Sequence, residues 1–135
     1  MEEEKKDIFK SFTEKAIRRL QDKRIRKYRT LYIPSLDENI RIRSLDYPEV
    51  VECTELAGEE DSTAGDRYSV YLSVVEPDLK KVAQEMKDQG VIQEYMEVVN
   101  IFNRDEVTQI ALEIMKLSDI IGDKKVHVVK ELKNS

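Results

Sequence analysis

The sequence predicts an α+β fold that is mostly α-helical, in which a small antiparallel β-hairpin packs on a bundle of about five to six helices. First, 38% of the 135 residues are charged and only four are Gly and three Pro, a composition that favours helices with solvated faces. Second, apolar residues recur at spacings of three and four over most of the chain after residue 45. Third, only residues 28–34 and 40–45 clearly alternate side chains as half-buried strands do.

Residues 5–27 predict a first helix with a narrow apolar stripe. The stripe and its flanks comprise Ile8, Phe9, Phe12, Ala16, Ile17 and Leu20. Acidic residues at the start of this helix and basic residues at its end suit the helix dipole. We therefore expect a stable helix that is only partly buried and that forms a charged arm.

The two alternating segments, residues 28–34 and 40–45, predict the strands of the hairpin. In the first strand Leu31 and Ile33 share one face, and in the second strand isoleucines alternate with arginines. The connection over residues 35–39 is short enough for an antiparallel hairpin. It holds no Gly, so no tight two-residue turn is predicted.

Asp46 begins the second predicted helix. Its carboxylate can cap the helix, with Pro48 in the first turn and Glu49 at the third helical position, where its side chain can reach back to the cap. The helix is expected to end near Gly58. Residues 59–65 are polar and show the weakest helix or strand pattern in the interior of the chain, so we expect disorder there.

Residues 68–90 predict two short helices joined by a kink at Pro77. This proline restricts Glu76 to extended conformations and suits the first turn of the following helix. Gly90 stands where a helix C-cap favours a left-handed residue. The apolar positions at helical spacing are Tyr68, Tyr71, Leu72, Val75, Leu79, Val82, Ala83 and Met86.

The C-terminal part of the chain predicts a short helix over residues 91–102 and a final helix of about five turns. Asn103 can cap the final helix with Glu106 at its third position, and Gly122 closes it. The apolar face of the final helix comprises Val107, Ile110, Ala111, Ile114, Met115 and Ile121. The tail over residues 123–135 is either frayed or a small edge strand, and the pattern leaves both open.

Charge and pattern divide the chain into a charged arm (residues 1–27), an α+β domain (residues 28–122) and a flexible tail (residues 123–135). Residues 1–30 hold 11 Lys or Arg against 6 Asp or Glu, whereas the remainder holds 12 against 22. The first helix is therefore basic and the body acidic. Eight acidic residues and no Lys or Arg lie between positions 44 and 66. This segment therefore has a stronger local field of one sign than the basic first helix.

Residue types needed for catalysis and for metal or cofactor binding are scarce. His127 is the only imidazole and lies in a charged segment near the C-terminus, where the rigid surroundings of a catalytic base are not expected. Cys53 is the only cysteine and lies at helical spacing from Val50 and Ala57, which is typical of a reduced thiol packed as a small hydrophobe. The four glycines form no phosphate-binding loop. We predict a protein with no enzymatic activity, cofactor or metal.

The same analysis predicts a cytoplasmic protein that does not contact a membrane. No apolar run approaches the roughly 18 residues of a membrane span, and the first residues lack the apolar run of a signal peptide. Seven Lys or Arg lie in residues 18–29. They suit a solvated helix end, contact with an acidic partner or with the acidic residues 44–66, or nucleic acid. Because the acidic body would repel phosphate, nucleic acid is the interpretation we favour least.

In the order of its segments, the chain resembles the XkdN-like family of tail assembly chaperones, small proteins of phages and prophages of Gram-positive bacteria. The resemblance covers residues 28–121, and its clearest pieces are residues 40–46, 75–79 and 90–91. One departure lies at residues 102–106, where Phe-Asn-Arg-Asp-Glu stands in place of a Leu and a Gly-Glu pair.

The resemblance implies a chaperone in the cytoplasm of the bacterial host that holds the long, helical tape measure protein soluble and assists assembly of the tail tube around it. Its partners would be the tape measure protein and the tail tube protein. Tyrosine and methionine side chains suit the core, and they also suit a groove for an amphipathic helix. The predicted protein-binding residues are Tyr68, Tyr71, Leu72, Met86, Tyr95, Met96 and Val99. Two alternatives stay open: a small regulatory nucleic-acid-binding protein that uses the basic first helix, and a structural tail component.

Overall fold

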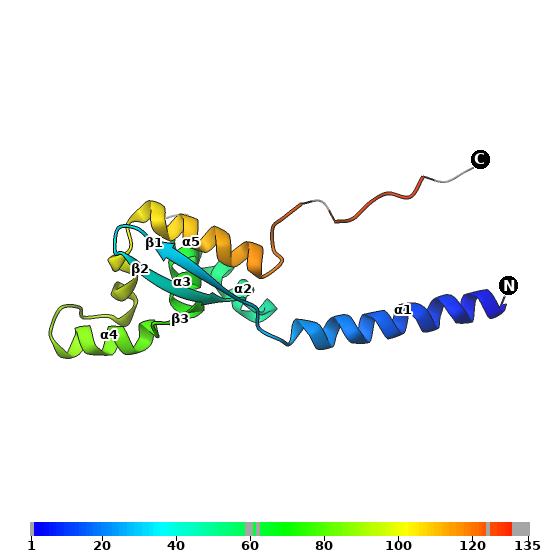
Figure 1. Cartoon of the computed structure of the whole chain (residues 1–135), viewed down its shortest axis with the longest axis horizontal. Coiled ribbons are helices and arrows are strands. Elements are labelled where there is room, and N and C mark those ends of the chain that lie inside the picture. The colour runs from blue at the N-terminus through cyan, green and yellow to red at the C-terminus, as the bar shows by residue number, and fades with distance from the viewer. Residues whose placement is uncertain (1, 59–60, 62, 124, 131–135) are drawn as a thin grey trace.

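The computed structural model describes residues 2–58, 61, 63–123 and 125–130. In these residues it has an α+β fold that is mostly helical, as the sequence predicts, although the sheet has three strands (Figure 1). The elements are α1 (Glu2–Lys23), β1 (Tyr28–Ile33), β2 (Glu38–Arg43), α2 (Tyr47–Leu56), α3 (Ala64–Ser73), β3 (Val74–Glu76), α4 (Leu79–Asp88), the 3-10 helix η1 (Tyr95–Ile101) and α5 (Arg104–Leu117).

Strands β1 and β2 form the predicted hairpin. Their antiparallel register pairs Tyr28 with Arg43 and Ile33 with Glu38, so four residues make the turn. Asp37 in this turn has φ +50°, a left-handed conformation that Asp adopts more readily than most residues. Ile40 and Ile42 are buried on the face that carries Leu31 and Ile33, which confirms the predicted apolar face of the sheet.

The third strand corrects the prediction that Val75 continues a helix up to Pro77. Helix α3 ends at Ser73, and β3 follows it directly and pairs antiparallel with β2, with an irregular register between Arg41 and Ile42. Two β-branched valines and a glutamate held extended by the next proline favour a strand at this position. The free edge of β2 gives that strand a partner. The Glu76–Pro77 peptide bond is cis.

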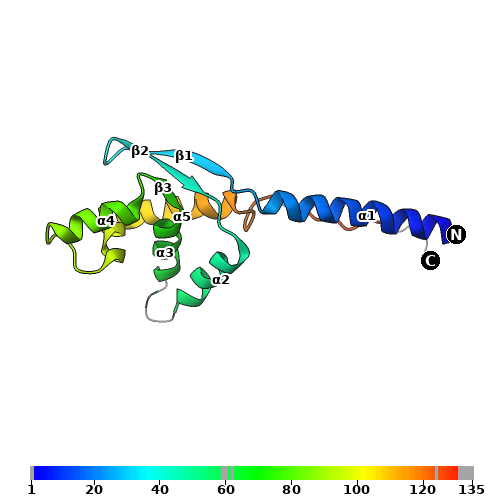
Figure 2. The same cartoon turned by 90° about the horizontal axis from the view of Figure 1, so that it is seen from below.

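Helices α2 and α3 form an antiparallel pair below the sheet (Figure 2). The predicted capping box is present, because Asp46 accepts a hydrogen bond from the Glu49 backbone and Glu49 accepts one from the Asp46 backbone. The predicted loop is shorter than expected, since Ala64 and Gly65 already belong to α3. Residues 59, 60 and 62 of the expected disordered segment lie outside the described residues.

The close approach of α2 and α3 depends on Gly65. This residue is buried in the first turn of α3, and a Cβ atom at its position would overlap the backbone carbonyl oxygen of Cys53 in α2. Only glycine therefore allows the two backbones to pack at this separation. Gly65 thus allows two helices to pack closely, whereas the sequence pattern had placed this residue in a loop.

Helix α5 packs against α3 and covers the apolar face of the sheet (Figure 2). It ends at Leu117, earlier than the predicted close at Gly122. Ser118 ends it by donating a hydrogen bond to the carbonyl of Ile114 (2.7 Å) while accepting one from the backbone of Leu45 (2.8 Å). Asp119, with φ +60°, takes the left-handed position that was assigned to Gly122.

The core lies between the sheet, α3, α4, η1 and α5. Its least exposed side chains include Ile42, Leu79, Ile114, Val70, Val98 and Val99. The dense apolar pattern of the C-terminal half therefore marks most of the core, and the hairpin supplies the rest.

Helix α1 extends away from the sheet and from the other helices (Figures 1 and 2). None of its residues is buried, so it is more exposed than the partly buried helix predicted from its stripe. In the described part of the tail, residues 125–130 are exposed and form neither helix nor strand, while residues 124 and 131–135 lie outside the description.

Candidate protein-binding groove

A largely apolar groove lies where the end of α2, the start of α3 and the 3-10 helix η1 meet. It encloses about 370 Å³. We call it the α2/α3/η1 groove, and its lining residues are Leu56, Asp61, Ala64, Arg67, Tyr68 and Met96. An open apolar depression with charged residues at its rim can take up an apolar side chain of a partner protein.

Local sequence positions part of this groove. Ala64 and Tyr68 are four residues apart on α3 and Arg67 lies between them, so the three side chains share one side of the helix. Leu56 comes from the last turn of α2 and is 49% exposed, and Met96 comes from η1. The tight α2–α3 contact at Gly65 brings Leu56 and Ala64 to the same groove.

Tyr68 is held in place by a hydrogen bond that its hydroxyl donates to the Glu52 carboxylate of α2 (2.9 Å). This bond raises the pKa of Tyr68, because the carboxylate favours the protonated phenol. Nearby in α2, burial raises the pKa of the Cys53 thiol to about 11, with neighbouring carboxylates adding to the effect. Both groups therefore stay uncharged at neutral pH.

Arg67 lines both the groove and a second, more polar pocket of about 400 Å³. Its guanidinium donates to the Asn100 side chain (2.9 Å), whereas its Nε is buried and has no acceptor among the described residues. Asp66 also lines the second pocket, and burial raises the pKa of its carboxyl. Arg67 therefore adds one guanidinium group to the otherwise largely apolar lining of the groove.

The structure brings only two of the predicted protein-binding residues into this groove, Tyr68 and Met96. Tyr71, Leu72 and Met86 are half-buried and pack against the core, as Met96 also does. Tyr95 is 39% exposed and donates to the Gln84 side chain (2.9 Å), with the Lys87 ammonium 4.3 Å from the centre of its ring.

Val99 requires a correction, because it is only 1% exposed and belongs to the core at the second pocket. The periodic pattern does not separate a groove residue from a core residue on the same helix. Sequence reasoning also missed Leu56, Asp61, Ala64 and Arg67. The spacing of Ala64 and Arg67 from Tyr68 is a local signal that could have found them, whereas Leu56 comes from another helix.

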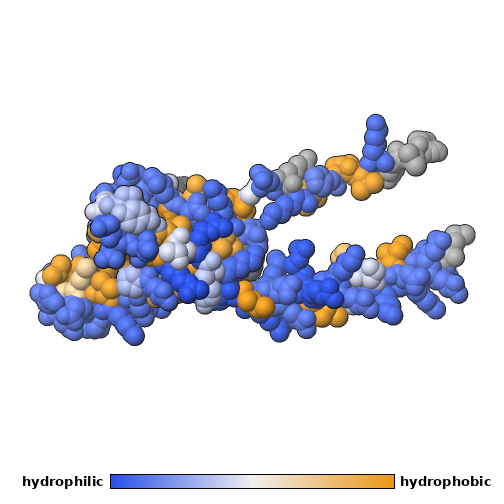
Figure 3. Space-filling model, in the orientation of Figure 1, coloured by the Kyte–Doolittle hydropathy of each residue, from blue (hydrophilic) through white to orange (hydrophobic). Residues whose placement is uncertain are grey.

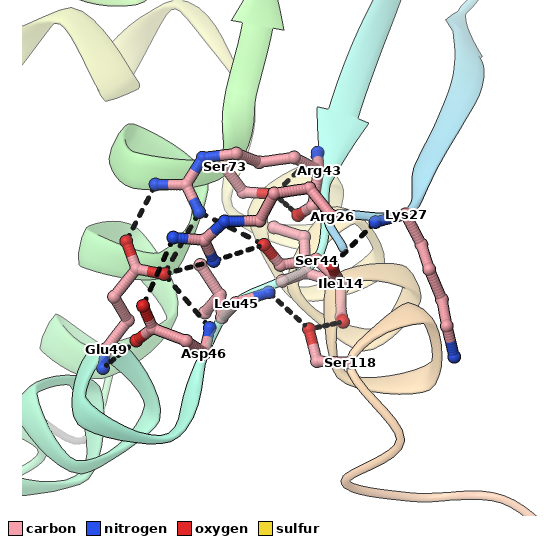
Figure 4. Close-up of polar contacts among 10 residues, drawn as sticks. All are labelled: Arg26, Lys27, Arg43, Ser44, Leu45, Asp46, Glu49, Ser73, Ile114 and Ser118. Atoms are coloured by element: carbon pink, nitrogen blue, oxygen red, sulfur yellow. Dashed lines mark hydrogen bonds and ion pairs between the residues drawn. The ribbon is translucent and has the colours of Figure 1, made fainter. Parts of the chain in front are cut away.

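The end of the basic stretch contacts acidic residues of the body (Figure 4). Arg26 pairs with Asp46 (3.2 Å) and Glu49 (2.7 Å), so for this arginine the structure shows contact with the acidic residues 44–66, one of the interpretations that the sequence left open. Further along, Lys27 pairs with Asp119 (2.7 Å) and Arg29 with Glu113 (2.8 Å). Three of the seven basic side chains therefore already have carboxylate partners.

Within the described ranges, no group of three or more His, Cys, Asp or Glu side chains is arranged to hold a metal ion. The same residues include no helix with the length and apolar character needed to cross a membrane. Comparison of the chain with protein-family models, with curated proteins and with solved structures gave no significant match.

Proposed function

We propose that this chain is a non-catalytic phage or prophage tail assembly chaperone, which binds an apolar, amphipathic helix of the tape measure protein in the bacterial cytoplasm. The observation that carries the proposal is the α2/α3/η1 groove, in which Tyr68 and Met96 form a surface with Leu56 and Ala64. The resemblance of residues 28–121 to the XkdN-like family supports the identity of the partner.

The chemistry of the groove suits transient binding of a helix. Methionine adapts its shape to different apolar side chains, and tyrosine adds a large rigid face, so the two together tolerate varied partner sequences. Burial of apolar surface would supply the affinity. The net charge of −5 opposes self-aggregation while the apolar surface is exposed.

Co-expression with the tape measure protein of the same phage element tests the proposal directly. We expect the soluble fraction of the tape measure protein to rise when this chain is present. Unchanged solubility would refute the chaperone function. In the same assay, assembly of the tail tube protein around the complex would extend the proposal to the second partner.

A matched set of variants locates the binding surface. Leu56→Glu and Met96→Glu place a charge in the groove and should abolish the gain in solubility. Tyr47→Glu is the control, because Tyr47 is 80% exposed and lines neither pocket. Circular dichroism and thermal unfolding confirm that each variant folds. If Tyr47→Glu weakened capture as much as Leu56→Glu, the groove would not be the binding surface.

Calorimetry on a purified tape measure fragment gives an independent measurement. Apolar burial predicts a negative heat-capacity change on binding and only moderate sensitivity to salt. A steep fall of affinity with salt would instead indicate binding through the charges of α1.

The nucleic-acid alternative uses the same basic helix and predicts a linear fall of log affinity for duplex DNA with log salt. The carboxylate partners of Arg26, Lys27 and Arg29 weigh against it, because phosphate would have to compete with those ion pairs. A structural tail component would remain in the finished tail, whereas a chaperone is expected to be absent from it.

A further inference from the structure

Helix α1 carries a group of large apolar side chains that are exposed. Five of its apolar residues are at least half exposed: Ile8 68%, Phe9 73%, Phe12 73%, Ile17 54% and Leu20 62%. Figure 3 shows apolar patches along the helix between charged side chains. Large apolar side chains that gather along one side of an exposed helix suit an interaction surface.

The rest of the described chain does not cover this stripe. Helix α1 buries no residue and makes no extensive contact with another element. Its attachment to the body comes after its end, through the ion pairs of Arg26 and Lys27. In proteins most helical stability comes from packing of an apolar face rather than from helix propensity, so a partner for the apolar face would stabilise α1.

We propose that α1 pairs antiparallel with α1 of a second copy of this chain, so that the protein forms a two-fold symmetric dimer through its arms. The proposal does not depend on the chaperone function, because it uses none of the residues of the α2/α3/η1 groove.

The spacing of the stripe favours self-pairing. Ile8, Phe12, Ala16 and Leu20 are arranged symmetrically about residue 14. In an antiparallel pair centred there, Ile8 of one copy lies opposite Leu20 of the other, and Phe12 lies opposite Ala16. A large ring then meets a small side chain on both sides of the two-fold axis, which is how facing helices interdigitate.

The charge pattern selects the antiparallel orientation. The first turn of α1 carries Glu2, Glu3 and Glu4, while its other end carries Lys23 followed by Arg24. An antiparallel pair centred on residue 14 places Glu4 of one copy opposite Arg24 of the other. A parallel pair would instead set acidic turn against acidic turn and basic end against basic end.

The shape of the molecule is compatible with this arrangement. Because α1 extends away from the body, antiparallel pairing places the two bodies at opposite ends of a helix pair roughly 33 Å long. The bodies then do not compete for the same space, and the groove of each copy stays accessible.

Sedimentation equilibrium of the full chain over about 1–300 µM tests self-association. We expect the average mass to rise from monomer towards dimer. Phe12→Glu should keep the chain monomeric over the whole range, whereas Ser11→Glu, which adds the same charge outside the stripe, should behave as the wild type. A wild-type chain that stays monomeric, or equal loss of association in both variants, would overturn the proposal.

Cross-linking tests the orientation. In a Cys53→Ser background, an equimolar mixture of Ile8→Cys and Leu20→Cys chains should give the mixed disulfide with a mild oxidant, and Ile8→Cys alone should give none. Efficient self-cross-linking of Ile8→Cys would reject the antiparallel pair.

Binding to vesicles of anionic phospholipid tests a membrane as the partner of the stripe. If the chain is monomeric, binds these vesicles through α1 and loses that binding in Phe12→Glu, the stripe is a membrane-binding surface and the dimer proposal is overturned.

Discussion

Arg43 and Glu49 form a two-point ion pair between the end of the sheet and the first turn of α2 (Figure 4). The guanidinium nitrogens donate to the two carboxylate oxygens at 3.0 and 2.7 Å, and each side chain is 17% exposed. Glu49 also accepts hydrogen bonds from Arg26 and from the backbone of Asp46. One carboxylate therefore joins the arm, the sheet and the second helix.

This arrangement predicts a stability contribution that depends on pH. The hydrogen bond from Arg43 is the main reason that the pKa of Glu49 falls from 4.5 to about 2. Between these two values the unfolded chain binds a proton that the folded chain does not, so stability falls as pH falls through this window. Above pH 4.5 the contribution is fully present.

Replacement of Glu49 by Gln should destabilise the protein by about 1–3 kcal/mol at pH 7, because charged donors lose their ionic acceptor. The difference from the wild type should shrink between pH 4.5 and 2, measured by urea unfolding across that range. Glu55→Gln, at an exposed position of the same helix, is the control. A constant difference down to pH 2 would show that Glu49 is not the titrating group.

Substitution of Gly65 by a larger residue should disturb the packing of α2 against α3. A methyl group at this position meets the backbone of Cys53, so Gly65→Ala should separate α2 from α3 and destabilise the fold by about 1–3 kcal/mol. Gly58→Ala is the matched control, since nothing lies within 4 Å of a Cβ placed there. Urea titration of both variants measures the effect, and equal stabilities would contradict the close approach of the two helices.

Ile114 is the centre of the core on α5, with 0% exposure. Ile114→Ala should cost about 2–5 kcal/mol, because it removes buried apolar contacts and leaves a cavity. Leu112→Ala changes a residue of the same helix that is 43% exposed and should cost much less. If urea titration showed that Ile114→Ala changes the free energy of unfolding by less than about 0.5 kcal/mol, Ile114 would not be a core residue.

Deletion of residues 1–20 should leave a cooperatively folding domain. The deleted residues bury nothing, while Arg26 and Lys27 and their ion pairs remain. Thermal unfolding of the dilute truncated chain should remain a single transition near that of the full chain. Loss of the folded state would mean that the apolar stripe of α1 completes the main core.

Local interactions explain which parts of the fold could be predicted. The capping box of Asp46 and Glu49 joins residues three apart in the chain, and the alternation of Ile40 and Ile42 reports a strand face directly. The apolar spacing of α5 likewise identified Ile114 as core. None of these features depends on a distant segment, so the residues themselves are sufficient.

For the same reason, only two of the six residues that line the candidate groove were predicted. Tyr68 could be identified because large apolar faces on a helix suit a partner. Met96 was predicted on the same grounds, whereas Leu56 comes from α2 and was missed. Val99 has the same helical signature although it is buried. Periodicity indicates that a residue is apolar and on a given face, but which neighbour covers that face is a tertiary property.

By itself, the sequence of this chain determined the helices with strong local caps, the hairpin with its apolar face and the basic-to-acidic division of charge. The tertiary structure alone decided that residues 74–76 become a strand, that Gly65 serves helix packing, and that the stripe of α1 stays uncovered. The physical reason is that capping and periodicity act within a few residues. Strand pairing and helix packing, by contrast, depend on which distant backbone presents a free edge or leaves room for a close approach.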